Sequence, residues 1–249
     1  MANIFDIGLV FTQIPRLLEY LPMTLEITIL SMIIGIVFGM VLAVFKIRRT
    51  PVLYRLTTIF VSFTRGTPLL VQLYITYYGI PIILKYYNYF NGTNYNVNSI
   101  PSLLFVLVAF SLNEAAFNSE NIRGAIQSID KGQLEAAHSL GMTSFQVLRR
   151  VIIPEAFVVA LPNLGNALIG LLKGTSLAFV CSVVEMTAQG QIIAGNDYRY
   201  FEVYISLAII YWALTILIEQ GIRFIEKRIS IPNVISEKTL KRGELYDTN

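Results

Sequence analysis

The most constraining feature of this sequence is a run of 19 residues without a charged side chain, from Ile27 to Phe45. A helix of about 20 apolar residues spans a bilayer core, because each residue adds about 1.5 Å and the core is about 30 Å thick. Similar stretches recur along the chain, which is 55% hydrophobic and only 14% charged. An ordinary soluble domain carries about a quarter charged residues, so the sequence predicts an all-α polytopic membrane protein.

Five transmembrane helices are predicted, each an apolar stretch bounded by charged or polar segments. Their approximate limits are residues 27–45, 56–84, 100–120, 151–172 and 203–218. Pro154 and Pro162 should kink or break the fourth span unless neighbours compensate, because proline lacks a backbone donor. The stretch from Gly174 to Gly195 is apolar but interrupted by polar residues, which predicts a broken or re-entrant helix.

Basic residues are unevenly divided between the two sides of the predicted bundle. Fourteen Lys and Arg residues fall on one side and three on the other, while Arg65 and Lys173 lie within membrane segments. Because cytoplasmic loops carry the excess of positive charge, we expect the N-terminus outside and the C-terminus in the cytoplasm. These basic residues flank apolar spans, so the net charge of +3 does not indicate a nucleic-acid partner.

Three regions follow from the same pattern. Residues 1–21 carry apolar side chains at helical spacing and predict an N-terminal interfacial amphipathic helix. Residues 22–229 form the transmembrane domain, with a charged loop at about 124–150, and residues 230–249 form a polar tail. One cysteine and one histidine provide neither an internal disulfide nor a metal cluster. No Gly-rich nucleotide loop occurs, so neither a catalytic site nor a cofactor is predicted in this chain.

The most informative stretch lies in the charged loop and reads KGQLEAAHSLGMTSFQVLRRVIIPEA. It predicts two short helices separated by Gly141, because glycine tolerates the left-handed conformation that ends a helix. Ala136 and Ala137 are small enough for close approach to a partner, and Glu135 is exposed enough to meet a basic residue. A plain solvated connector is the alternative.

The order Glu135-Ala136-Ala137, Gly141 and then Val-Ile-Ile-Pro closely resembles the loop motif of ABC importer permeases. In that family the loop forms a coupling helix that docks in a cleft of the ATPase subunit. The stretches RGTPLLVQLY, RGAIQSIDKGQLEAA and KGTSLA narrow the resemblance to the permeases for polar amino acids. Glu155 and Gly174 depart from the family pattern. Glutamine is more common at the position of Glu155, and an acidic residue is common at the position of Gly174.

The resemblance implies the membrane subunit of an ATP-driven amino-acid importer in a bacterial plasma membrane. Its implied partners are a dimer of ATP-binding subunits that use ATP and Mg, a second copy or related permease, and an extracytoplasmic binding protein, separate or fused. The implied substrate is a polar amino acid, with a lean towards cystine. An ion-coupled secondary transporter or channel is the alternative, although five spans without an inverted repeat argue against it.

Arg65 is the leading candidate for substrate contact. A charged side chain near mid-membrane should face a bundle interior or a water-filled cavity, and a guanidinium matches a carboxylate bidentately. An ion pair between Arg65 and Glu114 or Glu120 is the structural alternative. The predicted substrate-binding residues are Arg65, Gly66, Thr67, Asn113, Glu114, Asn166, Lys173, Thr175 and Ser176. The predicted ATPase-coupling residues are Glu135, Ala136, Ala137 and Gly141.

Several of these polar side chains have a simpler explanation. Asn113, Glu114 and Asn166 serve equally well as interhelical hydrogen-bonding groups. Glu185 is expected to be either a gate or a buried ion-pair partner. The tyrosines at the outer end of the second span fit an aromatic interfacial belt without any ligand.

Overall fold

The computed structural model describes residues 5–229, and the regular structure within this range is entirely helical. The predicted polar tail, residues 230–249, lies outside the described residues. The elements are α1 (Ile7–Leu18), α2 (Leu21–Arg48), α3 (Pro51–Gly66), α4 (Leu69–Asn91), η1 (Val97–Ser99), α5 (Ser102–Gln127), α6 (Lys131–Ser139), α7 (Ser144–Val147), η2 (Leu148–Ile152), α8 (Ile153–Gly174), η3 (Thr175–Cys181), α9 (Met186–Asp197) and α10 (Tyr200–Ile229).

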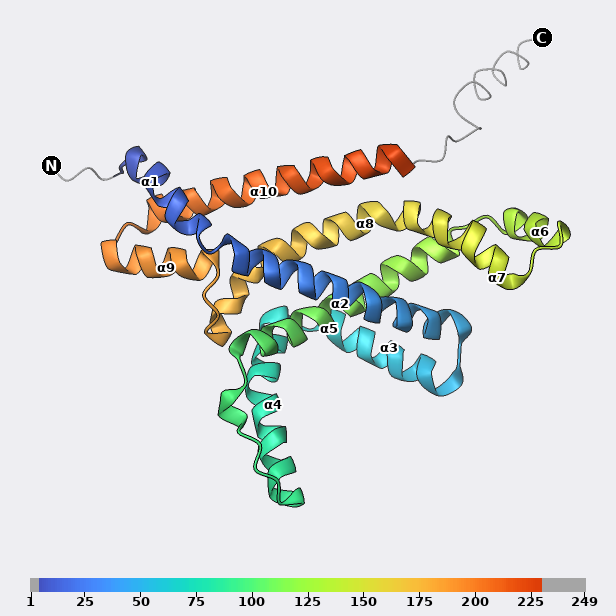
Figure 1. Cartoon of the computed structure of the whole chain (residues 1–249), viewed down its shortest axis with the longest axis horizontal. Coiled ribbons are helices and arrows are strands. Elements are labelled where there is room, and N and C mark those ends of the chain that lie inside the picture. Colours follow the sequence, from blue (N-terminus) through green and yellow to red (C-terminus); the bar gives the residue numbers. More distant parts are fainter. Residues whose placement is uncertain (1–4, 230–249) are drawn as a thin grey trace, which may run out of the picture.

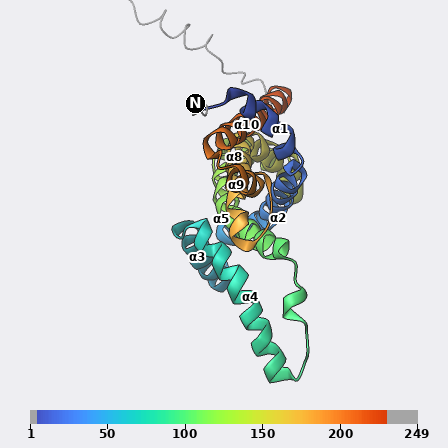
Figure 2. The same ribbon diagram turned by 90° about the vertical axis from the view of Figure 1, so that its left-hand side faces the viewer.

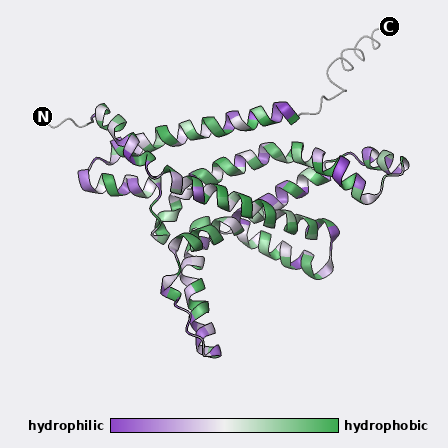
Figure 3. Cartoon of the chain, in the orientation of Figure 1, coloured by the Kyte–Doolittle hydropathy of each residue, from purple (hydrophilic) through white to green (hydrophobic). Residues whose placement is uncertain are grey.

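Helices α2, α5, α8 and α10 run along the long axis of the molecule (Figure 1) and form a bundle when viewed end-on (Figure 2). Five helical stretches are long and apolar enough to cross a membrane: Leu21–Arg48, Leu69–Asn91, Ser102–Gln127, Ser144–Cys181 and Tyr200–Ile229. Hydrophobic residues dominate the long helices, whereas hydrophilic residues gather around α6 and α7 (Figure 3). The predicted all-α polytopic fold with five spans is therefore confirmed.

The second predicted span is not one continuous helix, and this prediction is wrong in that respect. Helix α3 ends at Gly66 and α4 begins at Leu69. Thr67 between them is extended, with φ −117° and ψ 144°, because Pro68 disfavours the helical conformation of the residue before it. Beyond this break α4 leaves the bundle and runs across the direction of the long helices (Figures 1 and 2).

The α2–α5 pair is the most closely packed part of the bundle. A Cβ atom added at Gly35 would lie 2.5 Å from Glu114 Cβ, and one at Gly39 would lie 3.1 Å from the Ala115 carbonyl oxygen. Small residues therefore allow the two backbones to approach. A buried cluster that includes Phe110, Leu73 and residues of α8 and η3 extends this core.

Helix α1 packs on α10 through one of its faces. Val10, Gln13 and Leu17 are buried, and the Ser206 hydroxyl donates a hydrogen bond to the Val10 carbonyl oxygen at 2.7 Å. Ile7 and Phe11, outside this face, are exposed. This arrangement leaves an apolar stripe free, which suits a helix lying at a membrane interface.

The two irregular segments predicted around α8 take distinct forms. A π-helical turn, η2, precedes Pro154, and α8 continues through Pro162. Beyond α8, the 3-10 helix η3 ends at Cys181, Ser182 adopts a left-handed conformation with φ 62°, and the chain is extended at Glu185. The predicted interruption between Gly174 and Gly195 is therefore confirmed.

Candidate functional site

The break between α3 and α4 is held by Gln72, one turn into α4. Its side-chain amide donates to the Thr64 carbonyl oxygen at 2.7 Å and to the Thr67 carbonyl and hydroxyl oxygens at 3.1 and 3.0 Å. The Thr67 hydroxyl donates to the Phe63 carbonyl oxygen at 3.0 Å. The Thr67 hydroxyl is therefore hydrogen-bonded to the local backbone in this structure, and Gln72 fixes the direction in which α4 leaves the break.

Gln72 also joins this break to α5. Its amide oxygen accepts a hydrogen bond from the Asn113 side chain at 3.0 Å, and Gln72 is only 8% exposed. Sequence reasoning did not single out Gln72, although a glutamine in an apolar run four residues after a proline was a usable signal. Asn113 thus has the interhelical hydrogen bond that was one of its two predicted roles.

A cavity of about 410 Å³, which we call the α5–α8 cavity, is lined in part by Asn113. Its walls come chiefly from α5 and α8, and several of the lining side chains are amides. The lining residues are Leu69, Asn113, Glu114, Phe117, Asn121, Asn163, Asn166, Ala167, Gly170, Leu171 and Gly174. Three of the predicted substrate-binding residues, Asn113, Glu114 and Asn166, are thereby brought together.

Glu114 is the one carboxylate among the residues that line this cavity. It is 7% exposed and accepts a hydrogen bond from Asn118 of the same helix at 3.2 Å. Asn118 in turn accepts from Asn121 at 3.5 Å. A line of polar side chains therefore follows α5 away from the Glu114 carboxylate.

Arg65 lies beside the same cavity. Its side chain is exposed, and its guanidinium carbon lies 5.2 Å from the centre of the Phe117 ring, which lines the cavity. The alternative pairing of Arg65 with Glu114 or Glu120 is absent from the structure: among the described residues, the ion-pair partners of Glu120 are Lys46 and Arg123. A cation stacked on an aromatic face keeps its N–H groups free for a ligand.

The predicted residues at the end of α8 and the start of η3 occupy a different place. Lys173 and Ser176 line a second cavity of about 500 Å³, which we call the α8–α10 cavity. The other lining residues are Thr187 of α9 and several residues of α10, among them Tyr204, Tyr211 and Trp212. Thr175 is fully buried and donates to the Leu172 carbonyl oxygen at 2.7 Å. The nine predicted substrate-binding residues are therefore divided between two cavities and their surroundings.

Glu185 forms a junction of three helices next to the second cavity. Its carboxylate is completely buried and caps α9 by accepting from the Ala188 backbone N–H at 2.8 Å. It also accepts from the Tyr211 hydroxyl of α10 at 3.1 Å and from Thr24 of α2 at 3.5 Å. Of the two roles predicted for Glu185, an ion pair is not found among the described residues.

The predicted coupling residues lie in a helical turn at one end of the bundle. Gly141 separates α6 from α7 with φ +78°, the left-handed conformation predicted for it. Glu135 and Ala136 are exposed, whereas Ala137 is buried against this chain. Leu140 and Phe145 are 80% and 68% exposed, so the turn presents apolar side chains outwards.

Three contacts fix this turn locally. The Asp130 carboxylate caps α6 by accepting from the backbone N–H groups of Gly132 and Gln133, and Thr143 and Gln146 form a capping box at α7. The Gln133 side chain, oriented with its NH₂ group towards α8, donates to the Glu155 carboxylate. Glu155, which departs from the family pattern, therefore ties α6 to the start of α8.

Residues 35–231 match the family described as the binding-protein-dependent transport system inner membrane component. The chain belongs to this family. It is 42% identical over 215 residues to a probable amino-acid permease protein, YxeN, of Bacillus subtilis (strain 168), covering 86% of this chain and 92% of the relative. It is 39% identical over 229 residues to the L-cystine transport system permease protein TcyL of the same organism, covering 92% and 93%.

A solved structure supports the same assignment. The chain resembles one described as the crystal structure of an amino acid ABC transporter with histidines, with a TM-score of 0.75 and 35% identity, covering 90% of this chain and 99% of the other. Permeases of this family are non-enzymatic membrane subunits.

Proposed function

We propose that this permease is the translocation subunit of an ATP-driven importer for polar amino acids. The observation that carries the proposal is the exposed α6–α7 turn, which lies at the end of the two helices, α5 and α8, that line the α5–α8 cavity. A partner that moves this turn would therefore act directly on the walls of the cavity. The amino-acid transporters named among the similar proteins support the substrate class.

The chemistry of the α5–α8 cavity suits a zwitterion. Arg65 on Phe117 offers a bidentate donor for a carboxylate, and Glu114 offers an acceptor for an ammonium group. The amides of Asn113, Asn121 and Asn166 can donate and accept with a polar side chain. Cystine is the first amino acid to test, because one relative carries that name.

The proposed orientation places α6 and α7 in the cytoplasm, with the N-terminus outside. Support comes from the basic residues that flank this end of the bundle and from the exposed Leu140 and Phe145. Exposed apolar side chains on short helices are suited to binding in a cleft of a partner protein. A pair of ATPase subunits would bind here, a second permease would complete the path, and a binding protein would deliver the amino acid on the opposite side.

The first experiment is co-purification of the tagged permease in mild detergent, followed by identification of its partners and an ATPase assay. Recovery of an ATP-hydrolysing subunit is expected. Glu135→Ala and a bulky substitution at Gly141 should reduce this recovery while membrane insertion is unchanged. A permease that purifies alone and moves an amino acid down an ion gradient would overturn the proposal in favour of a secondary transporter.

The second experiment tests Arg65 by uptake of labelled amino acids into proteoliposomes. Arg65→Lys keeps the positive charge but removes the bidentate fork, so uptake is expected to fall by about tenfold or more, as for a lost charge-assisted hydrogen bond of about 1.5–3 kcal/mol. Lys85→Gln, on α4 at a residue that lines neither cavity, is the matched control. Equal uptake by the Arg65→Lys variant and the wild type would remove Arg65 from the proposed site.

A further inference from the structure

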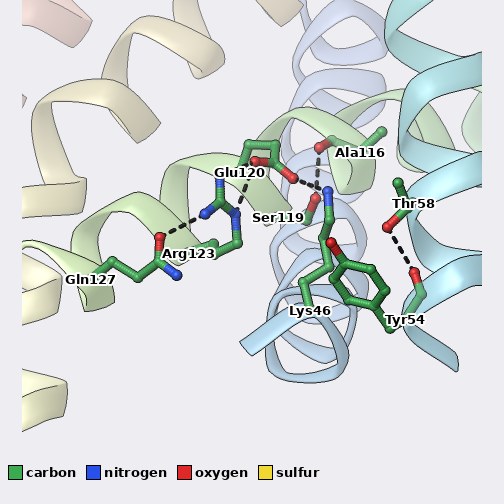
Figure 4. A network of polar contacts seen from close by, with 8 residues as sticks. All are labelled: Lys46, Tyr54, Thr58, Ala116, Ser119, Glu120, Arg123 and Gln127. Carbon is green, nitrogen blue, oxygen red and sulfur yellow. Dashed lines mark hydrogen bonds and ion pairs between the residues drawn. The ribbon is translucent and has the colours of Figure 1, made fainter. Parts of the chain in front are cut away.

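A cluster of charged side chains joins α2 to α5 near the ends that face α6. The Glu120 carboxylate of α5 accepts a hydrogen bond from the Lys46 ammonium of α2 through one oxygen. Its other oxygen accepts from Arg123 Nε at 3.0 Å and Nη2 at 2.6 Å. Arg123 also donates to Gln127 at 2.6 Å (Figure 4). One carboxylate therefore holds cations from two different helices.

The Lys46–Glu120 pair of this cluster is largely shielded from water and lies at the end of a tight helix contact. The side chains of Lys46 and Glu120 are 14% and 16% exposed. Further along the same two helices, Gly35 and Gly39 bring α2 to within backbone contact of α5. An ion pair in such surroundings is stronger than one on the surface, and removing Glu120 takes the anionic partner away from both Lys46 and Arg123.

Glu120 also occupies a particular place along α5. The helix lines the α5–α8 cavity through residues up to Asn121, and it ends at Gln127, shortly before α6 begins at Lys131. Near that end, Ala125 and Ile129 pack against Ala156 and Ala160 of α8. Along α5, the Glu120 cluster therefore lies between the α5–α8 cavity and α6, so a movement of α5 caused by a ligand in the cavity would include this cluster.

We propose that Glu120 is a positioning residue that fastens α2 to α5, so that changes at the α5–α8 cavity and movements of α6 are transmitted through one rigid pair of helices. This inference rests on the proposed function, because it concerns how occupancy of the cavity reaches the ATPase partner. Coupling between sites needs a rigid or two-state element whose position both sites influence. The α2–α5 pair, closed by small residues and fastened by Glu120, is such an element.

The test uses the complete transporter in liposomes, with substrate-stimulated and basal ATP hydrolysis measured separately. Glu120→Gln is expected to lower the stimulation by about tenfold, within the range of measured coupling between sites, while basal hydrolysis continues. Adding Lys46→Met to this variant should cause little further loss, because both substitutions break the same contact. Glu219→Gln, which breaks the exposed pair with Arg223 on α10, is the matched control and should leave stimulation unchanged.

A covalent link gives a second, independent readout. In a Cys181→Ser background, the double variant Lys46→Cys and Glu120→Cys should lose stimulation, and a short bis-thiosulfonate linker between the two thiols should restore it. A merely folding-related role for the charges would not predict this rescue. Linking that fails to restore stimulation, or a Glu120→Gln variant that responds like the wild type, overturns the inference. A wild-type transporter without substrate-stimulated hydrolysis would instead refute the proposed function on which it rests.

Discussion

The substitution Gly35→Ala tests the packing of α2 on α5. The added Cβ would lie 2.5 Å from Glu114 Cβ and 3.3 Å from two backbone atoms, Glu114 C and Ala115 N. Carbon atoms pack best at about 3.5–4.0 Å, so the helices must separate by about 1 Å. Backbone atoms cannot rotate out of the way, and overpacking costs about 1–3 kcal/mol. The gain in helix propensity from glycine to alanine, about 1 kcal/mol, opposes this cost.

The expected net result is a loss of up to about 2 kcal/mol in the free energy of unfolding. For a chain of this size it corresponds to a fall of up to about 8 °C in the unfolding temperature in detergent. Gly221→Ala on α10 is the matched control, because its added Cβ meets nothing within 4 Å. Its unfolding temperature should stay constant or rise slightly. If Gly35→Ala is as stable as Gly221→Ala, the tight contact between α2 and α5 does not exist in the protein.

Substitutions at Glu185, Gly141 and Gln72 probe the other contacts. Glu185→Ala should lower the unfolding temperature, because each buried donor left unpaired costs about 1–3 kcal/mol. Glu185→Gln retains an acceptor and should lower the unfolding temperature less. Equal effects of the two substitutions would contradict the junction with Tyr211. Gly141→Val should reduce the amount of ATPase partner recovered, because a residue with a side chain costs about 1–2 kcal/mol in the left-handed conformation. Unchanged recovery would refute the role of the α6–α7 turn in binding that partner. Gln72→Leu should reduce uptake through loss of the Asn113 contact, while Gln191→Leu, outside that contact, should not.

Much of the fold follows from local chemistry that can be read from the sequence. Apolar runs of membrane-spanning length predict the long helices, and Gly141 predicts the turn between α6 and α7, because both depend on residues adjacent in the chain. The break at Thr67 also had a local cause, the following Pro68. Interpreting residues 56–84 as one span gave too little weight to that proline within an otherwise apolar run.

The sequence by itself therefore determined the class of protein, the number of spans and the turn between α6 and α7. Only the tertiary structure decided that Lys173 and Asn166 line different cavities, because that depends on which neighbour each face of α8 meets. It also decided that Glu120 pairs with Lys46, 74 positions away, rather than with Arg65. Helical periodicity specifies which side chains share a face, but the partner across that face is set by how the helices pack.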